Sequence, residues 1–329
     1  MPPHRVGAVG DQAGVVVDCW PVDDNRGIYI VDQLATTFAL PVIDEGELRR
    51  ARAGDYFITA VPRGHHGSFS STITLNAPVV SEERIEVDQT NESFVLNNTW
   101  IIKWNMTVGS HRTLTKERRL SEHQYPHTPA HFGHISWTSP DNSEHVLAGV
   151  QEFLPGSVDG WTWCVARAME NQCDTWPGAL GEIVALMHNA FDGTTLAHGD
   201  LHVGQILNQG DSYYIIDFDG DPLGHTPESW LQDVVGMLCS FIHVAAVAEV
   251  KYHAPHDFSE WVRIVSDRFL ETYLATRSGV SLPPRDQLLA LMAHKEVAEM
   301  LYATTYLPEW TYAAEYGHAF VERLIGESQ

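Results

Sequence analysis

The sequence predicts an α+β chain that folds in two lobes, with a small β-rich region in front of them. Residues 93–96 and 100–104 are short runs of β-branched and aromatic residues joined by an asparagine-rich turn, which is typical of a strand pair. Farther along, apolar side chains recur at helical spacing from Leu180 to Met187, and a largely apolar run covers residues 232–241. We therefore expect strands in the first half and helices in the second.

This pattern divides the chain into three regions. Residues 1–80 are expected to form the β-rich cap, residues 81–155 the first lobe, and residues 156–329 the helical second lobe. The cap contains strand-like runs separated by turn residues, at 14–20, 27–31 and 55–61, and a loop at 62–68.

The composition limits the partners and the compartment. The 329 residues include 43 Asp or Glu and 20 Lys or Arg, so the formal net charge is −23. Such a charge repels the phosphates of nucleic acids and anionic membranes, and we expect neither as a partner. Four cysteines without metal-binding spacing and no signal-like N-terminal segment indicate the cytoplasm. Residues 234–250 are the longest apolar stretch, but polar residues such as Ser240 and Glu249 interrupt it, so we expect a buried helix.

An acidic loop in the second lobe gives the clearest chemical signal. The tripeptide His-Gly-Asp ends at Asp200, Gln205 follows five residues later, and Asp217 comes directly after a strand-like run at residues 212–216. Phosphoryl transfer from a nucleotide needs a carboxylate that orients and deprotonates the acceptor hydroxyl, and an amide and a second carboxylate that hold Mg²⁺. Asp200 fits the catalytic base, and Gln205 and Asp217 fit the metal ligands.

These motifs resemble those of the aminoglycoside-phosphotransferase-like kinases, and within them the maltokinases and the actinobacterial glucosamine kinases. The shared features are the His-Gly-Asp loop, a metal-binding amide that is Gln205 where Asn is usual, the acid-Phe-acid run that begins at Asp217, and the helix at residues 232–241. The resemblance extends from about Glu82 to the C-terminus. It implies a bilobal protein-kinase-like fold with an N-terminal cap, and a kinase that uses ATP and Mg²⁺.

The nucleotide is expected to bind to the first lobe. Lys103 is alone on an otherwise apolar strand, and a buried ammonium needs an anion such as a nucleotide phosphate or a carboxylate. Glu117, on the next helix, is the first candidate for that carboxylate and Glu122 the second. The alternative is that Lys103 faces solvent from an edge strand.

Two further segments of the first lobe are assigned to the nucleotide by the resemblance. The loop ahead of the lysine strand contains no glycine, so Thr90, Asn91 and Ser93 would contact the phosphates; the alternative is an ordinary polar turn. The segment that includes Gln151 and Phe153 matches the hinge between lobes, and backbone groups of these two residues would bind adenine.

Three residues near the catalytic loop have other expected roles. We expect the ring of His198 to bond to backbone within the loop, and Asp233 to be a buried acid that accepts backbone N–H bonds from it, so both would be structural. Asp219 would face the same side of an extended strand as Asp217 and would bind a second Mg²⁺ or the sugar; the alternative is a solvated loop acid.

The same loop also suggests a zinc site, because His198 and His202 lie four residues apart. Gly199 and Asp200 interrupt any helix there, and no third ligand follows at a familiar spacing, so we reject zinc. We expect His202 to line the acceptor pocket or to pack beside it.

The acceptor site is expected in the second lobe, facing Asp200. A predicted helix carries Glu296 and Glu299 three residues apart and continues into an aromatic segment that includes Trp310. Aromatic faces stack on pyranose rings, and carboxylates bind sugar hydroxyls or a protonated amine. We expect these three residues to bind the sugar; the alternative is an amphipathic helix whose aromatic residues belong to the core.

These features together predict ATP-dependent phosphorylation of an amino sugar. We expect glucosamine, phosphorylated at O6, because residues 151–163 look closer to the glucosamine kinase branch than to the maltokinases. The alternatives are maltose phosphorylated at O1, another aminosugar, an aminocyclitol, an aminoglycoside, or a nucleotide-binding pseudokinase. The presence of Lys103, Asp200, Gln205 and Asp217 argues against the pseudokinase. We expect a monomer or a homodimer.

Overall fold

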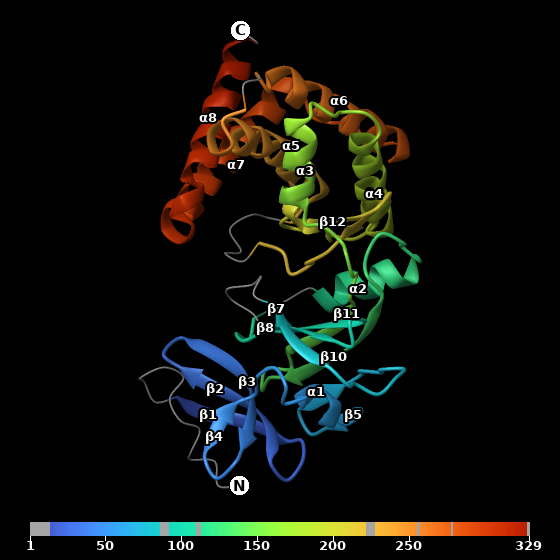
Figure 1. Ribbon diagram of the computed structural model, residues 1–329, viewed down its shortest axis with the longest axis vertical. Helices are drawn as coiled ribbons and strands as arrows, with labels where there is room; N and C mark the ends of the chain where they lie inside the picture. The colour runs from blue at the N-terminus through green and yellow to red at the C-terminus, as the bar shows by residue number, and fades with distance from the viewer. Residues whose placement is uncertain are drawn as a thin grey trace. The chain divides into compact units, whose positions relative to one another are not determined.

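The computed structural model describes residues 14–85, 92–109, 113–221, 228–254, 257–277 and 279–327 (Figure 1). The chain separates into two compact units. The first contains the described residues up to 109 together with 129–155, and the second contains residues 113–128 together with the described residues from 156 onwards.

The first unit is built from two antiparallel sheets and one short helix. A four-stranded sheet has the order β1-β2-β3-β4, and a seven-stranded sheet has the order β5-β6-β10-β11-β9-β8-β7. The strands are β1 Val15–Pro21, β2 Arg26–Gln33, β3 Thr36–Asp44, β4 Leu48–Arg50, β5 Gly64–His66, β6 Phe69–Ser71, β7 Glu82–Ile85, β8 Glu92–Leu96, β9 Trp100–Trp104, β10 His131–Thr138 and β11 Glu144–Glu152, and the helix is α1 Phe57–Ala60.

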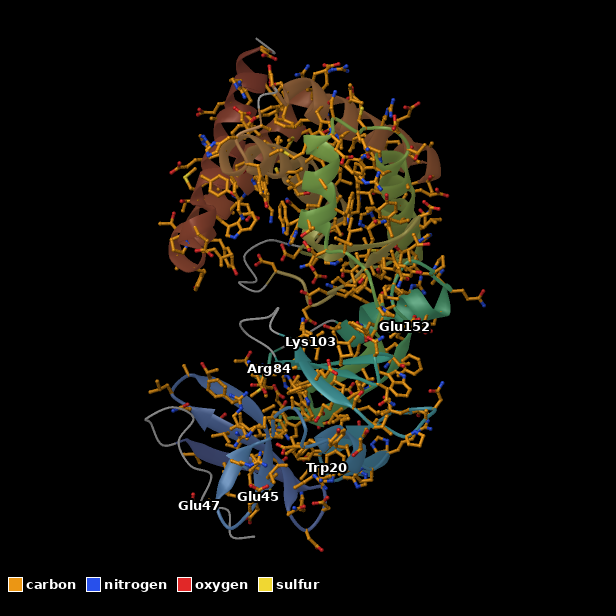
Figure 2. The ribbon with its side chains drawn as sticks, viewed as in Figure 1. Trp20, Glu45, Glu47, Arg84, Lys103 and Glu152 are labelled. Carbon is orange, nitrogen blue, oxygen red and sulfur yellow. The ribbon has the colours of Figure 1, made fainter. Side chains whose placement is uncertain are left out.

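The two sheets of this unit share one hydrophobic core. Trp20 on β1 is buried, and its ring stacks on His66 with 4.5 Å between centroids (Figure 2). The neighbouring Asp18 accepts hydrogen bonds from Ser68 and from the indole N–H of Trp137. The predicted cap strands β1 and β2 are therefore joined to the larger sheet by packing and by polar contacts.

Two expectations for the cap segment were wrong. Residues 55–61 are not a strand, because Tyr56 adopts a left-handed backbone conformation with φ 51° and starts the helix α1. Residues 62–68 are not a plain loop, because β5 and the start of the β5–β6 hairpin lie there and pair into the seven-stranded sheet. The described part of the cap thus includes edge strands of the larger sheet.

The second unit is mostly helical. It contains α2 Thr113–Glu122, α3 Gly160–Met169, α4 Trp176–Ala190, the 3₁₀ turn η1 Val203–Gln205, the hairpin β12 Ile206–Gln209 and β13 Ser212–Ile215, α5 Trp230–Ala246, the π-helical turn η2 Val247–Lys251, α6 Ser259–Thr276, α7 Arg285–Tyr306, the 3₁₀ turn η3 Pro308–Trp310 and α8 Thr311–Gly326.

Helix α5 is the central helix of this unit. It packs against α3, α6, α7 and α8, and almost all of its residues are buried. Within the described residues, α5 and η2 (Trp230–Lys251) form the one helix that is long and apolar enough to cross a membrane, and 89% of its most apolar window is buried inside the protein. Of the polar residues that interrupt the apolar run, Ser240 is buried and donates to the carbonyl of Met237, whereas Glu249 is half-buried and accepts the hydroxyl of Tyr316.

The strands predicted at residues 93–96, 100–104 and 212–216 are also present, as β8, β9 and β13. Residues 93–96 and 100–104 form β8 and β9, which pair in register from Glu92 opposite Trp104 to Leu96 opposite Trp100. In the second unit, β12 and β13 form a hairpin with Ile206 opposite Ile215. This hairpin places the residues before β12 beside the residues after β13, which is where the candidate site lies.

Candidate functional site

The catalytic loop is fixed by a buried carboxylate from α5. Asp233 is 1% exposed, and its side chain accepts the backbone N–H of His198 at 2.7 Å and of Gly199 at 2.9 Å. A third donor, Nε2 of His188, lies 2.9 Å from the same carboxylate. Burial alone would raise the pKa of Asp233, but the hydrogen bonds and the neighbouring histidines outweigh it and hold the pKa below its usual range.

The ring of His198 is bonded on both sides to backbone. Its Nε2 donates to the carbonyl of Ile216 at 2.9 Å, and its Nδ1 accepts the backbone N–H of Asp200 at 3.3 Å. The ring also packs on Phe218 with 5.0 Å between centroids. His198 therefore connects the catalytic loop to the segment after β13 and has no ring nitrogen left for a substrate.

The two predicted metal ligands are brought together by the β12–β13 hairpin. The side-chain amide of Gln205 lies 3.4 Å from a carboxylate oxygen of Asp217, and the backbone N–H of Ile216 donates to the carbonyl of Gln205. Asp217 adopts a left-handed backbone conformation with φ 64°, which is uncommon for a residue other than glycine and tends to occur at functional sites.

The side chain of Asp219 is positioned by a contact with helix α2, and not by the alternation of side chains along a strand. Strand β13 ends at Ile215, and the left-handed turn at Asp217 removes the alternation from which a common side was predicted for the two acids. A carboxylate oxygen of Asp219 instead accepts the hydroxyl of Thr113 at 2.5 Å.

The donor chemistry of this group fits Mg²⁺. Mg²⁺ prefers oxygen ligands and is commonly bound through one or two carboxylates together with substrate phosphates. Gln205 and Asp217 supply an amide oxygen and a carboxylate, and Asp219 supplies a second carboxylate nearby in sequence. Within the described residues no group of three or more His, Cys, Asp or Glu side chains is arranged to hold a metal.

A lysine that the sequence analysis did not single out lies beside the predicted base. Nζ of Lys295 on α7 is 3.9 Å from Asp200 and 2.7 Å from Glu299, one helical turn further along α7. Burial alone would lower the pKa of Lys295, but Glu299 and Asp200 outweigh it and raise the pKa. The only sequence signal for this contact is the i,i+4 spacing of Lys295 and Glu299.

The two predicted acceptor carboxylates point to different places. Glu299 is directed towards Asp200 through Lys295, whereas Glu296 is 0% exposed and accepts from Nε2 of His243 at 2.8 Å. The Glu296 carboxylate also lies against α8, where a Cβ at Gly317 would come within 2.3 Å of it. The prediction that Glu296 binds the sugar is therefore wrong, because its side chain is enclosed between helices.

Three aromatic side chains form a row that begins at His202, next to the catalytic loop. His202 stacks on Trp161 with 5.8 Å between centroids, and Trp161 contacts Trp310 at 5.5 Å. Trp310 is half-buried, and the ammonium of Lys251 lies 5.8 Å from its ring. Nδ1 of His202 accepts the N–H of Gly204, and burial lowers the pKa of His202 despite the opposing charges of Asp200 and Glu299. Through His202, which follows Asp200 by two residues, these rings adjoin the catalytic loop.

In the first unit, Lys103 lies on a central strand (Figure 2). Strand β9 is between β8 and β11, so the alternative of an edge-strand lysine is excluded. Alternate residues of β9 face the core, and Lys103 is half-buried on the opposite face. Its cross-strand neighbours are Ser93 and Gly149, and a Cβ at Gly149 would meet only the ring of His131 at 4.0 Å, so there is room beside the lysine.

The other residues assigned to the nucleotide are only partly described. Thr90 and Asn91 lie outside the described residues. Gln151 is at the end of β11, and the backbone N–H of Phe153 donates to the carbonyl of Thr99 at 2.8 Å, so adenine could use only the carbonyl of Phe153.

The candidate carboxylate partners of Lys103 are both on α2, in the second unit. Glu117 is half-buried, whereas Glu122 is exposed and lies 3.8 Å from Arg119. The pairing of Lys103 with Glu117 stays a prediction.

Two known proteins with a similar sequence are glucosamine kinases. A glucosamine kinase of Mycolicibacterium smegmatis is 28% identical, and the alignment covers 82% of this chain and 89% of that protein. A glucosamine kinase of Streptacidiphilus jiangxiensis is 26% identical, with 85% of each chain covered. The chain is thus similar to two glucosamine kinases over most of its length. No protein-family model matches it.

Solved glucosamine kinase structures have the same fold. One, in complex with glucosamine, ADP and inorganic phosphate, superposes with a TM-score of 0.75 at 21% identity and covers 95% of this chain and 94% of that one. A second, in another crystal form, gives a TM-score of 0.77 at 21% identity over 98% and 97% of the two chains. The α+β kinase-like fold predicted from the sequence is confirmed, and so is the resemblance to this group of kinases.

Proposed function

We propose that this protein transfers the γ-phosphoryl group of ATP to a hydroxyl of an amino sugar, and that the acceptor is glucosamine, phosphorylated at O6. The observation that carries the proposal is the similarity to glucosamine kinases over more than four fifths of the chain. The arrangement of Asp200, Gln205 and Asp217 around one hairpin supplies the groups that the reaction needs.

The reaction follows from the positions of these groups. Asp200 accepts the proton of the acceptor hydroxyl as its oxygen attacks the γ-phosphorus; the new O–P bond forms while the bond from the γ-phosphorus to the bridging oxygen breaks, and ADP leaves. Gln205 and Asp217 would hold Mg²⁺, which neutralises phosphate charge when bound. Lys103 and Ser93 would bind the nucleotide phosphates from the first unit. The hydrogen bond from the Asp200 N–H to His198 keeps the base fixed.

The charges around the base favour a cationic acceptor. The ammonium of Lys295 lies between the carboxylates of Asp200 and Glu299, so this group of three side chains carries one net negative charge. A protonated amine on the sugar would be attracted to it, and the rings of Trp161 and Trp310 offer the apolar surface on which a pyranose stacks. Glu299, His202 and Trp310 are therefore the residues that we propose for acceptor binding.

The acceptor is tested by an ADP-release assay with ATP and Mg²⁺. The panel is glucosamine, N-acetylglucosamine, glucose, maltose and kanamycin. We expect turnover with glucosamine and little with its N-acetyl form, because acetylation removes the positive charge. Preference for maltose would replace glucosamine by maltose as the acceptor, and absence of turnover with every sugar would contradict the proposed function.

The base is tested by Asp200→Asn. The amide cannot accept the proton but nearly preserves the shape, so we expect turnover to fall by about two decades or more with ATP affinity nearly unchanged. The matched control is Asp211→Asn, which removes an exposed carboxylate from the β12–β13 turn. Wild-type turnover of Asp200→Asn would show that another group is the base.

The remaining proposals concern partners and compartment. We place the protein in the cytoplasm, since all four cysteines are unpaired, and we expect a monomer or a homodimer without nucleic acid or membrane partners. Size-exclusion chromatography with light scattering decides between monomer and homodimer.

A further inference from the structure

Helix α2 carries a lysine that is completely buried. The side chain of Lys116 is 0% exposed, and its Nζ donates to the carbonyl of His198 at 2.8 Å and to a carboxylate oxygen of Glu228 at 2.9 Å. A buried ammonium is strongly unfavourable unless it is paired and hydrogen-bonded. Hydrophobic packing would serve stability at least as well in such a position, so the ion pair needs another explanation.

The two partners of Lys116 lie at the catalytic loop around Asp200 and beside the segment 217–221 that follows β13, which carries Asp217 and Asp219 and is called the metal loop here. His198 precedes Gly199 and the base Asp200, so its carbonyl belongs to the catalytic loop. Gly220 follows the segment of the metal ligands, and a Cβ there would come within 3.1 Å of Glu228 and 3.4 Å of Nζ of Lys116.

The two loops also meet at a pair of glycines. Gly199 and Gly220 both have positive φ angles, 91° and 82°. A Cβ on Gly199 would lie 3.1 Å from the Cα of Gly220 and 3.1 Å from Glu228. The catalytic loop and the metal loop are thus packed backbone to backbone, and Lys116 and Glu228 lie at that contact.

A second bond from the same helix reaches the metal loop. Thr113, three residues before Lys116, donates its hydroxyl to Asp219. Glu228 in turn precedes α5, whose residue Asp233 binds the backbone of the catalytic loop from the other side. Helices α2 and α5 together therefore fix the catalytic loop relative to the metal loop.

We propose that Lys116 and Glu228 are positioning residues for phosphoryl transfer, whose ion pair sets the placement of the base Asp200 relative to the metal ligand Asp217. The proposal rests on the proposed kinase function. Neither residue is among those proposed for acceptor binding, so we expect their loss to act on the chemical step and on Mg²⁺-dependent nucleotide binding, and to leave the KM for the sugar nearly unchanged.

The test compares Lys116→Met, Glu228→Gln and the double variant. Lys116→Met keeps the length of the side chain without its charge. We expect kcat to fall about tenfold to a hundredfold, the range expected when reacting groups are displaced by about 1 Å, and the Mg²⁺ concentration for half-maximal ATP binding to rise. Because the residues act as one pair, we expect the double variant to lose no more than the worse single variant.

The control and a second readout separate positioning from stability. Arg118→Met removes an exposed charge from the same helix and should leave kcat and Mg²⁺ dependence unchanged. Amide hydrogen exchange at residues 198–201 should become faster in Lys116→Met and not in the control. If Lys116→Met does not fold, Glu228→Gln and the double variant decide.

Two outcomes would overturn the proposal. One is a folded Lys116→Met or Glu228→Gln with wild-type kcat and Mg²⁺ dependence, and the other is an activity loss that matches the loss of folded protein alone. ATP binding and hydrogen exchange need no acceptor, so they test this proposal even if the wild-type protein does not phosphorylate glucosamine.

Discussion

At the scale of single residues, Asp233 is the most constrained group of the candidate site. Its carboxylate is the acceptor for three donors, and one of them, His188, is itself fixed by the hydroxyl of Tyr273 at Nδ1. Because the Asp233 carboxylate can only accept, Nε2 of His188 carries a proton, and burial lowers the pKa of His188, which favours the neutral ring in which Nδ1 accepts the Tyr273 hydroxyl. The buried charge of Asp233 is thus stabilised by three hydrogen-bond donors and not by a fully charged cation.

Removing this carboxylate should destabilise the protein. In Asp233→Asn the amide has one acceptor oxygen for three donors, so we expect the free energy of unfolding to fall by about 3 kcal/mol. Urea denaturation at pH 7.5 measures the loss, and Asp211→Asn is the exposed control. An unchanged midpoint would mean that the loop does not depend on Asp233.

The same network predicts a pH dependence of stability. The folded pKa of His188 is below its unfolded value of 6.5, so the unfolded chain takes up that proton first and stability declines as the pH falls below about 6.5. The folded pKa of Asp233 is also lowered, so its contribution is lost at more acidic pH. Denaturation midpoints at pH 7.5 and 5.5 should differ in this direction for the wild-type protein.

Sequence reasoning located some of these residues and missed others for a physical reason. Asp200, Gln205 and Asp217 lie within one short stretch, so a local spacing indicates a shared site. Lys295 and Lys116 reach the same loops from about a hundred residues away, and no local pattern records such a contact. Glu296 and Glu299 have equivalent sequence signals, and only the packing of α7 against α5 and α8 distinguishes them.

At the scale of elements, helix α3 sets the position of the turn that carries Gln205. Its N-cap is Asp159, whose side chain accepts the N–H of Thr162 at 3.0 Å. The first helical residue, Gly160, lies so close to η1 that a Cβ would be 1.5 Å from the carbonyl oxygen of Val203. The start of the helix and the turn that carries Gln205 therefore approach each other through backbone atoms.

This close approach predicts the effect of Gly160→Ala. The added methyl group must move η1, so we expect a loss of about 2 kcal/mol in the free energy of unfolding together with weaker Mg²⁺-dependent ATP binding. Gly326→Ala, where a Cβ would meet nothing within 4 Å, is the control. Wild-type stability and Mg²⁺ dependence in Gly160→Ala would show that η1 tolerates displacement.

The strands and helices show where local pattern suffices. Strands β8 and β9 were predicted from β-branched and aromatic runs on either side of an asparagine-rich turn, and helix α4 from apolar residues at helical spacing. Residues 55–61 have strand-like composition but form α1, because Asp55 is bound by Arg49 and Tyr56 turns the backbone into the left-handed region. In residues 55–61, the contact with Arg49 outside the segment outweighs the strand preference of the segment's own residues.

At the scale of the whole molecule, the described residues form two hydrophobic cores, one in each compact unit. The two-lobed α+β fold could be predicted because the motifs appear in the order of a kinase. The shared core of the first unit could not be predicted. The boundary of the cap at residue 80 was drawn from composition, which does not show that the described cap strands pack into the same core as β8 to β11.

The net charge of −23 predicts a salt effect on the acceptor. An acidic protein attracts a cationic sugar over distances that salt screens, so we expect the KM for glucosamine to rise by about threefold when the salt concentration is raised from about 0.05 to 0.5 M. The apparent affinity of a neutral sugar, as acceptor or as competitor, should not change. Equal effects on both sugars would show that the overall charge does not act on the acceptor.

The stacking of Trp20 on His66 and the bonds of Asp18 to Ser68 and Trp137 have an evolutionary consequence. A domain that can be lost, exchanged or fused elsewhere must leave no exposed core behind, and the four-stranded sheet does not meet that condition. A mutation in β1 would have to be matched by changes in β5, β6 or β10. We expect the first eighty residues to have been inherited with the rest of the unit as one piece, and to vary among relatives in step with it.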